Sequence, residues 1–304
     1  MSPRVWPAVL AAAAVGIQVG AATVASRAVV GEVGPVTLAL LRYAIGACCL
    51  LPFFFAAPRV RLAPRDLLAV AALGIGQFGI LVALLNLSLL YITSARAVLL
   101  FATFPLMTML LAAALGRERL SLLKTLGVAL SFAGVGLALL DKLAVGAVAP
   151  GAWIGVVAVL GSALTGAVCS VLYRPYLQKY PTLPVSTLAM LASVAFLAVL
   201  AIPEGMMATL PRLGAAAWLA VFFIGLSSGI AYFGWLWALG RLPPTQVTVF
   251  LSLSPITAAL LGAVFLGERL SPLTLAGLAA VVGGLLLAFV RPARPQSQRR
   301  TRAL

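Results

Sequence analysis

The sequence has 304 residues, of which 63% are hydrophobic and only 9% are charged, with a formal net charge of +15. Because soluble domains carry about 25% charged residues, this composition excludes a protein whose whole surface faces water. Membrane β-barrels are also disfavoured, since their strands are only roughly 10 residues long. Apolar runs of about 20 residues are typical of helices that span a bilayer, so we expect an all-α integral membrane protein.

Ten apolar segments, separated by charges and by Pro or Gly residues, are predicted to form transmembrane helices. The first resembles a signal peptide, but its apolar run exceeds the usual 7–15 residues, so we interpret it as a spanning helix. The ten segments lie at about 5–27, 35–57, 67–90, 95–115, 122–140, 152–172, 184–203, 214–238, 244–265 and 272–290.

The second half of the chain repeats the first half at an offset of 150 residues. The tetrapeptide Glu118–Ser121 returns as Glu268–Ser271 at this offset. Five helices per copy is an odd number, so the second copy must cross the membrane in the opposite direction. We therefore predict two inverted repeats, residues 1–142 and 143–291, with a basic cytoplasmic tail at 292–304. Inverted repeats of this kind typify secondary transporters. Four further residues keep their identity at the offset: Gly79, Pro105, Gly127 and Gly134, which become Gly229, Pro255, Gly277 and Gly284.

The basic residues are divided unevenly between the two predicted membrane faces. With a cytoplasmic N-terminus, 15 Lys and Arg residues fall inside and 5 fall outside, which is the positive-inside pattern. We therefore predict cytoplasmic termini in a bacterial inner (plasma) membrane, with the basic charge facing anionic headgroups and no nucleic-acid partner. The chain has no histidine, and its three cysteines lie in apolar runs without metal-ligand spacing. We expect no metal and no other cofactor.

Two motifs carry a resemblance to a known family. The first half reads Phe104-Pro105 and then Gly116–Ser121, and the second half reads Ser254-Pro255 and then Gly267–Ser271. Together with ten predicted helices and a Pro35 … Arg42-Tyr43 opening, these motifs resemble the drug/metabolite transporter superfamily, specifically its EamA-type members. The resemblance covers the whole chain and implies export of amino acids, other metabolites or drugs, with the aromatic amino-acid exporters as one plausible branch.

Arg42 is the only charged residue well inside a predicted span. A charge at the bilayer centre costs at least about 2.5–3.5 kcal/mol to insert, so we expect Arg42 to face a cavity or a set of carbonyl groups. In a cavity it could receive a substrate carboxylate. A structural use, in which it snorkels or joins loop carbonyls, is an open alternative.

Polar and aromatic residues share one helical face in each of two other predicted spans. These residues are Ser162, Thr165, Cys169 and Tyr173 in one span and Ser228, Tyr232 and Trp235 in the other. Such faces avoid lipid, where polar groups find no partner. They are either cavity walls or helix–helix contacts. The predicted substrate-binding residues are Arg42, Gln77, Phe78, Phe101, Ser162, Thr165, Tyr232 and Trp235.

Pro105 and Pro255 lie about ten residues inside their predicted spans, where each removes a backbone donor and kinks the helix. We expect the pair to shape the cavity and to flex during transport, with ordinary packing kinks as the alternative. The repeated glycines are expected to let the fifth and tenth helices pack closely, or to serve a dimer contact. Glu118 and Arg119 are expected to form a local ion pair, with Ser121 as a helix cap.

None of the six acidic residues lies deep in a predicted span, and proton relays through membranes normally use such residues. We therefore predict a secondary transporter, not an enzyme, that exports amino acids without a buried proton carrier. Glu32 and Asp141 are the fallback for proton coupling. Open alternatives are export of drugs or other metabolites, such as nucleotide-related compounds, and a membrane-embedded enzyme or structural subunit. The oligomeric state is expected to be a monomer or a weak homodimer.

Overall fold

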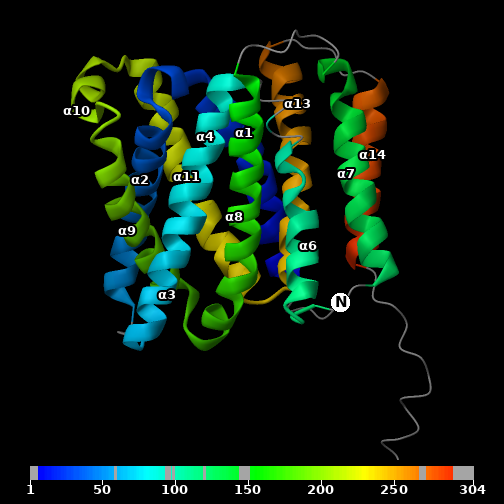
Figure 1. Ribbon diagram of the computed structural model, residues 1–304, viewed down its shortest axis with the longest axis horizontal. Helices are drawn as coiled ribbons and strands as arrows, with labels where there is room; N and C mark the ends of the chain where they lie inside the picture. Colours follow the sequence, from blue (N-terminus) through cyan, green and yellow to red (C-terminus); the bar gives the residue numbers. More distant parts are fainter. Residues whose placement is uncertain are drawn as a thin grey trace, which may run out of the picture.

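The computed structural model describes residues 6–57, 60–92, 97, 100–118, 121–143, 151–266 and 272–289. Across these residues the fold is helical, without strands, as the composition predicts. The long helices run side by side along one common direction, and the short α10 lies at one corner of the bundle (Figure 1).

The first half of the chain forms six described α-helices and one π-helical turn. They are α1 (Trp6–Val33), α2 (Pro35–Ala56), α3 (Pro64–Gly74), the π-helix η1 (Ile75–Ile80), α4 (Leu81–Tyr91), α6 (Phe104–Ala114) and α7 (Leu122–Leu143). The second half contains α8 (Ala152–Lys179), α9 (Thr182–Ala201), α10 (Met206–Thr209), the 3₁₀ turn η2 (Leu210–Arg212), α11 (Ala215–Leu239), α12 (Pro244–Thr248), the 3₁₀ turn η3 (Val249–Ser252), α13 (Leu253–Leu266) and α14 (Pro272–Phe289).

Six helical segments of the described chain are long and apolar enough to cross a membrane. They comprise α1, α2, the continuous run from α3 through η1 to α4, α8, α9 and α11. Shorter apolar helices occupy the remaining predicted spans. The count of ten spans therefore stays a prediction, while the all-helical membrane class is confirmed. The basic tail and the second motif, Glu268–Ser271, lie outside the described residues.

The predicted end of the sixth span, at about 172, is wrong because α8 continues to Lys179. Pro175 lies inside this helix and has no N–H to donate to the carbonyl four residues earlier. That carbonyl, on Val171, accepts a hydrogen bond from Nη1 of Arg117 at 2.8 Å. The guanidinium therefore replaces the missing donor, which allows the helix to pass the proline.

Helices α7 and α14 pack closely through reciprocal glycine contacts. A Cβ at Gly134 would lie 2.8 Å from the carbonyl oxygen of Gly277, and a Cβ at Gly284 would lie 2.5 Å from that of Gly127. The expected tight packing of these helices is thus confirmed. Because the early part of each helix meets the late part of the other, the two run antiparallel, side by side at one edge of the bundle (Figure 1).

The same reciprocity recurs elsewhere in the bundle. A Cβ at Gly229 of α11 would lie 2.7 Å from Cα of Gly46 in α2, and a Cβ at Gly79 of η1 would lie 3.3 Å from the ring of Phe196 in α9. Gly79 and Gly229 are equivalent at the repeat offset, and so are Gly46 and Phe196. Exchanging the two halves therefore turns one contact into the other.

The N-terminal helix crosses over to the second half of the chain. It packs mainly against α11, α13 and η3. Gly16 and Gly20 make this possible, because a Cβ at either position would overlap the carbonyl oxygen of Phe250 or Ser254. Two small residues four positions apart permit this close backbone approach between helices.

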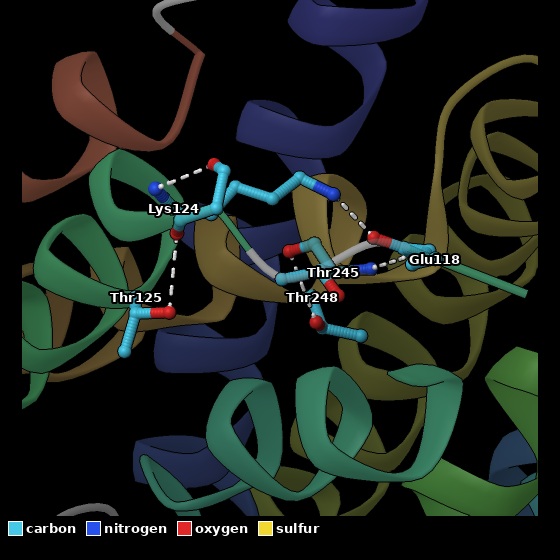
Figure 2. A network of polar contacts seen from close by, with 6 residues as sticks. Glu118, Lys124, Thr125, Thr245 and Thr248 are labelled. Atoms are coloured by element: carbon cyan, nitrogen blue, oxygen red, sulfur yellow. Dashed lines mark hydrogen bonds and ion pairs between the residues drawn. The ribbon is translucent and has the colours of Figure 1, made fainter. Parts of the chain in front are cut away.

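Glu118 joins the two halves at the end of the bundle where α6 stops (Figure 2). Its Oε2 pairs with Nζ of Lys124 at 2.5 Å, and its Oε1 accepts a hydrogen bond from the backbone N–H of Thr245 at 3.1 Å. The expected partner, Arg119, lies outside the described residues. The expected cap is confirmed, since Oγ of Ser121 accepts from the N–H of Lys124 at 3.3 Å.

Candidate substrate-binding site

A small pocket with about 30 Å³ of free space lies between the helices of the two halves. Its walls come from α1, α2, η1, α4, α11, the segment before α6, the first residue of α6 and the turn η3. The lining combines apolar, aromatic and polar side chains, as ligand sites commonly do. The lining residues are Val15, Val19, Thr23, Arg42, Gln77, Leu81, Leu85, Phe101, Phe104, Tyr232, Trp235 and Leu251.

Both prolines lie in the first turn of a helix beside this pocket, and their role as kinks that flex during transport stays a prediction. Pro105 lies in the first turn of α6, which follows a turn at 102–103. Pro255 lies in the first turn of α13, which follows η3. A proline cannot donate to the residue four positions earlier, and its ring clashes with that carbonyl. These residues, Phe101 and Leu251, both line the pocket.

Equivalent residues of the two halves face the same pocket. Phe101 and Leu251 are equivalent at the repeat offset, and so are Leu85 and Trp235. All four line the pocket. The pocket therefore lies where the two halves meet, and each equivalent pair supplies one aromatic and one leucine side chain.

Arg42 brings the one formal charge of the pocket lining. The residue is 4% exposed, and its Nε donates a hydrogen bond to Oγ of Ser228 at 2.7 Å. The guanidinium carbon lies 5.6 Å from the ring centroid of Tyr232 and 5.9 Å from that of Tyr43, within cation–π range. Among the described residues no carboxylate pairs with Arg42. The terminal nitrogens are therefore available to a bound anion.

Two more polar groups of the lining lack partners. Oε1 of Gln77 and Nε1 of Trp235 are buried and make no hydrogen bond within the described part of the chain. Buried polar atoms normally find a partner, and an exception calls for an explanation. Both side chains line the pocket, although these two atoms are covered in this structure. The lining thus combines a cation with two side chains that each have a polar atom without a partner among the described residues.

Three of the predicted substrate-binding residues lie outside the pocket lining. Phe78 is fully buried behind it, with its ring centroid 5.1 Å from that of Tyr232. Oγ of Ser162 donates to the carbonyl of Leu81 at 2.7 Å and so joins α8 to α4. Oγ1 of Thr165 donates to Gly161 in its own helix at 2.8 Å. For Ser162 and Thr165 the structure shows the hydrogen bonding within and between helices that was the alternative interpretation.

The other five predicted residues, Arg42, Gln77, Phe101, Tyr232 and Trp235, do meet at the pocket. The contribution of α1 was not predicted, because its lining residues Val15, Val19 and Thr23 lie in a largely apolar run like that of a lipid-facing helix. Leu251 was not predicted either, although the repeat offset from Phe101 points to that position. No cluster of three potential metal ligands occurs among the described residues.

The sequence matches the model of the EamA-like transporter family over residues 6–140 and again over residues 153–290. The chain belongs to the EamA-like transporter family. The name of the family agrees with the resemblance found in the two proline and Glu-Arg-Leu-Ser motifs. It identifies the chain as a multi-pass membrane protein of a transporter family.

Related proteins carry similar names. An uncharacterized transporter of Archaeoglobus fulgidus is 26% identical over 88% of this chain and 93% of its own length. A protein of Streptantibioticus cattleyicolor, described as a "probable terminal-alkyne amino-acid exporter", is 33% identical over 73% of each chain. A solved crystal structure with 25% sequence identity superposes with a TM-score of 0.77 and covers 93% of this chain and 95% of its own.

Proposed function

We propose that this EamA-family protein is a secondary transporter that exports amino acids with apolar or aromatic side chains. The observation that carries the proposal is the pocket itself, in which one unneutralised guanidinium lies among aromatic and leucine side chains. The carboxylate of an amino acid would bind Arg42, because guanidinium groups bind carboxylates through charge-assisted, often bidentate, hydrogen bonds.

The remaining groups of the pocket suit the other two parts of an amino acid. An ammonium group would donate to Oε1 of Gln77, which has no partner among the described residues. Trp235 would donate to a second carboxylate oxygen. An apolar side chain would then pack against Phe101, Phe104 and Leu251, which close the pocket on the side of the two interrupted helices.

The charge of the pocket argues against the alternative of a cationic-drug exporter. Its lining contains Arg42 and no acidic residue, so a cation without a carboxylate would meet repulsion and no counter-charge. Other metabolite anions, including nucleotide-related ones, would also be attracted by Arg42. Several phosphates of such an anion would, however, share one guanidinium, so most of their charge would lack a partner in the lining. The name of the Streptantibioticus relative also supports an amino-acid substrate.

Alternating access between two inverted halves is the proposed mechanism. The exchange of contacts between equivalent glycines supports two halves with opposite orientation. The position of the pocket between equivalent residues supports a substrate site at their junction, as in other transporters with inverted repeats. The halves would correspond to residues 1–142 and 143–291, with both termini on the cytoplasmic side of the plasma membrane.

Export is proposed to follow the substrate gradient without a buried proton carrier. The described acidic side chains lie at helix ends, where Asp66 pairs with Lys179 and Glu118 pairs with Lys124. Glu204 accepts hydrogen bonds from the backbone N–H groups of Val36 and Thr37. The Asp141 side chain lies outside the described part of the structure.

Counterflow in proteoliposomes tests the substrate assignment. Vesicles loaded with unlabelled phenylalanine should accumulate labelled phenylalanine or leucine saturably, whereas vesicles loaded with lysine should not. Phenylethylamine is the matched control, because it keeps the aromatic ring and the ammonium group but lacks the carboxylate. Exchange of phenylethylamine at the rate of phenylalanine would contradict the proposed role of Arg42, and absence of any amino-acid exchange would contradict the function.

A further inference from the structure

A second apolar space, separate from the substrate pocket, lies along the groove between α1 and α11. Its volume is about 490 Å³, and every lining residue that the structure describes belongs to α1 or α11. The rim is open to the surroundings of the bundle, since Ala14 is exposed and Ile230 is 66% exposed. The lining residues are Ala11, Ala14, Val15, Gln18, Ser227, Ile230, Ala231, Phe233, Gly234 and Trp237.

The amide nitrogen of Gln18 in the groove is already used in hydrogen bonds to serine side chains of α11. Nε2 of Gln18 donates to Oγ of Ser227 at 3.0 Å and to Oγ of Ser228 at 3.2 Å. Oε1 of Gln18 is enclosed and not exposed to the groove. The groove therefore presents an apolar wall to whatever enters it from the side. From Ser227 to Trp237 this wall extends for about 15 Å at 1.5 Å per residue.

A free positive charge lies at one end of the groove. The guanidinium carbon of Arg241 stacks 3.9 Å from the ring centroid of Trp237, and its Nη1 donates to the carbonyl of Trp237 at 3.2 Å. The Arg241 side chain is exposed and pairs with no carboxylate among the described residues. Trp and Arg together are typical of the depth at which lipid headgroups lie.

We propose that this groove binds one acyl chain of an anionic phospholipid whose phosphate is held by Arg241. The apolar wall suits the acyl chain, and the stacked arginine suits the phosphate. Along α11 the apolar wall comes first and Arg241 follows, which matches the order of tail and headgroup in a leaflet. The predicted basic face of the membrane protein attracts such lipids by the same charge. This proposal does not depend on the identity of the transported substrate.

The lipid site is physically connected to the substrate pocket. Val15 lines both spaces. Ser228 accepts from Nε2 of Gln18 on the groove side and from Nε of Arg42 on the pocket side. An acyl chain bound between α1 and α11 therefore contacts the same two helices whose side chains position the Arg42 guanidinium. Bound lipid should stabilise the arrangement of α1 against α11 that is seen in this structure.

Native mass spectrometry of the purified full-length protein tests the site. The wild type should retain one phosphatidylglycerol several-fold more readily than phosphatidylcholine of the same chain length. The Arg241→Gln variant should lose that preference, and Gly234→Leu, which fills the groove, should bind both lipids several-fold less. Arg212→Gln is the matched control, because Arg212 is an exposed arginine of another loop, and it should keep the wild-type preference.

Photocrosslinking provides a second measurement that does not depend on the folding of the variants. Phosphatidylglycerol with a diazirine in its acyl chain should label the wild-type peptide that contains Ser227–Trp237. Labelling confined to other helices would overturn the proposal, and so would an unchanged lipid preference in Arg241→Gln. Glycerol phosphate, the headgroup without a chain, should not compete with the lipid. Full competition by it would also overturn the acyl-chain assignment.

Discussion

The Ser131 hydroxyl donates a hydrogen bond to the carbonyl oxygen of Val281, 150 residues away and 3.4 Å distant. This separation equals the offset of the sequence repeat, so each partner is the equivalent of the other in the opposite half. A contact between equivalent positions falls on the axis that exchanges two related halves, as at an isologous interface. The reciprocal glycine contacts lie on either side of it along α7 and α14.

Substitution of the glycines around this axis should weaken the whole fold. Gly134→Leu places a side chain against the carbonyl of Gly277, and overpacking of this kind costs about 1–3 kcal/mol. The melting temperature of the detergent-purified protein should fall accordingly. Gly136→Leu is the matched control, because a Cβ at Gly136 meets no atom within 4 Å. Equal losses in both variants would contradict the packing role.

Replacing Arg42 should reduce transport while leaving the fold intact. Arg42→Gln keeps a donor near Ser228 but removes the charge that would hold a carboxylate, and charged hydrogen bonds contribute about 1.5–3 kcal/mol. Since about 1.4 kcal/mol of binding free energy corresponds to a factor of ten in affinity, we expect the apparent affinity for phenylalanine in counterflow to fall by roughly 10-fold or more. The affinity for a phenylalanine ester, which keeps the ammonium group but lacks the carboxylate, should not fall in the variant, because the repulsion from Arg42 is also removed.

The two leucines of the equivalent pairs should set the size of the transported side chain. Leu251→Trp would narrow the pocket opposite Phe101, since both residues line it. Exchange of phenylalanine and tryptophan should then fall several-fold more than exchange of alanine. The substitution Leu260→Trp is the control, because Leu260 is exposed on α13, the helix that follows the turn containing Leu251. A uniform loss for all substrates in Leu251→Trp would indicate misfolding and not altered specificity.

Arg117 and Pro175 should be energetically coupled through the carbonyl of Val171. Arg117→Leu leaves that carbonyl without its donor, and an unsatisfied buried acceptor costs about 1–3 kcal/mol. Pro175→Ala restores a backbone N–H that can bond to Val171 within the helix. In the Pro175→Ala background the same Arg117→Leu substitution should therefore lower the melting temperature much less. Additive losses in the double variant would refute the compensation.

Glu204 should hold the two halves together at the end of the bundle where α2 begins. Its carboxylate accepts from the N–H groups of Val36 at 3.0 Å and Thr37 at 2.5 Å, at the beginning of α2. Glu204→Ala removes a helix cap, which typically costs about 0.5–2 kcal/mol. Modification of a cysteine introduced at Thr23, which lines the pocket, by an impermeant thiol reagent should become faster. Glu32→Ala, at another exposed acid on that side, should leave the rate unchanged.

Much of the site could be predicted from the sequence because charge and polarity are costly in a bilayer. Arg42 and Gln77 stand out in apolar runs, and both line the pocket. Ser162 and Thr165 stand out for the same reason, yet they bond to carbonyl groups of Leu81 and Gly161. A hydroxyl group can be satisfied by a carbonyl of its own or a neighbouring helix, so spacing alone does not separate packing from a cavity.

The helix breaks and the role of α1 were harder to predict. The sequence indicates that a proline disturbs a helix, but not whether the result is a bend or an interruption. Here the residues before Pro255 adopt the 3₁₀ turn η3, and those before Pro105 adopt a turn at 102–103. In the sequence, the apolar residues of α1 that line the pocket cannot be distinguished from residues that face lipid.

The contacts of Gly16 and Gly20 have a mechanical consequence for transport. Backbone atoms of α1 lie against those of η3 and α13 without side chains between them, so these segments must move as one body. The first helix in the sequence is therefore a component of the opposite half in any rocking motion. A chain that ended after α7 would leave the face of α1 around Gly16 and Gly20 bare, and we expect neither half to assemble its moving unit alone.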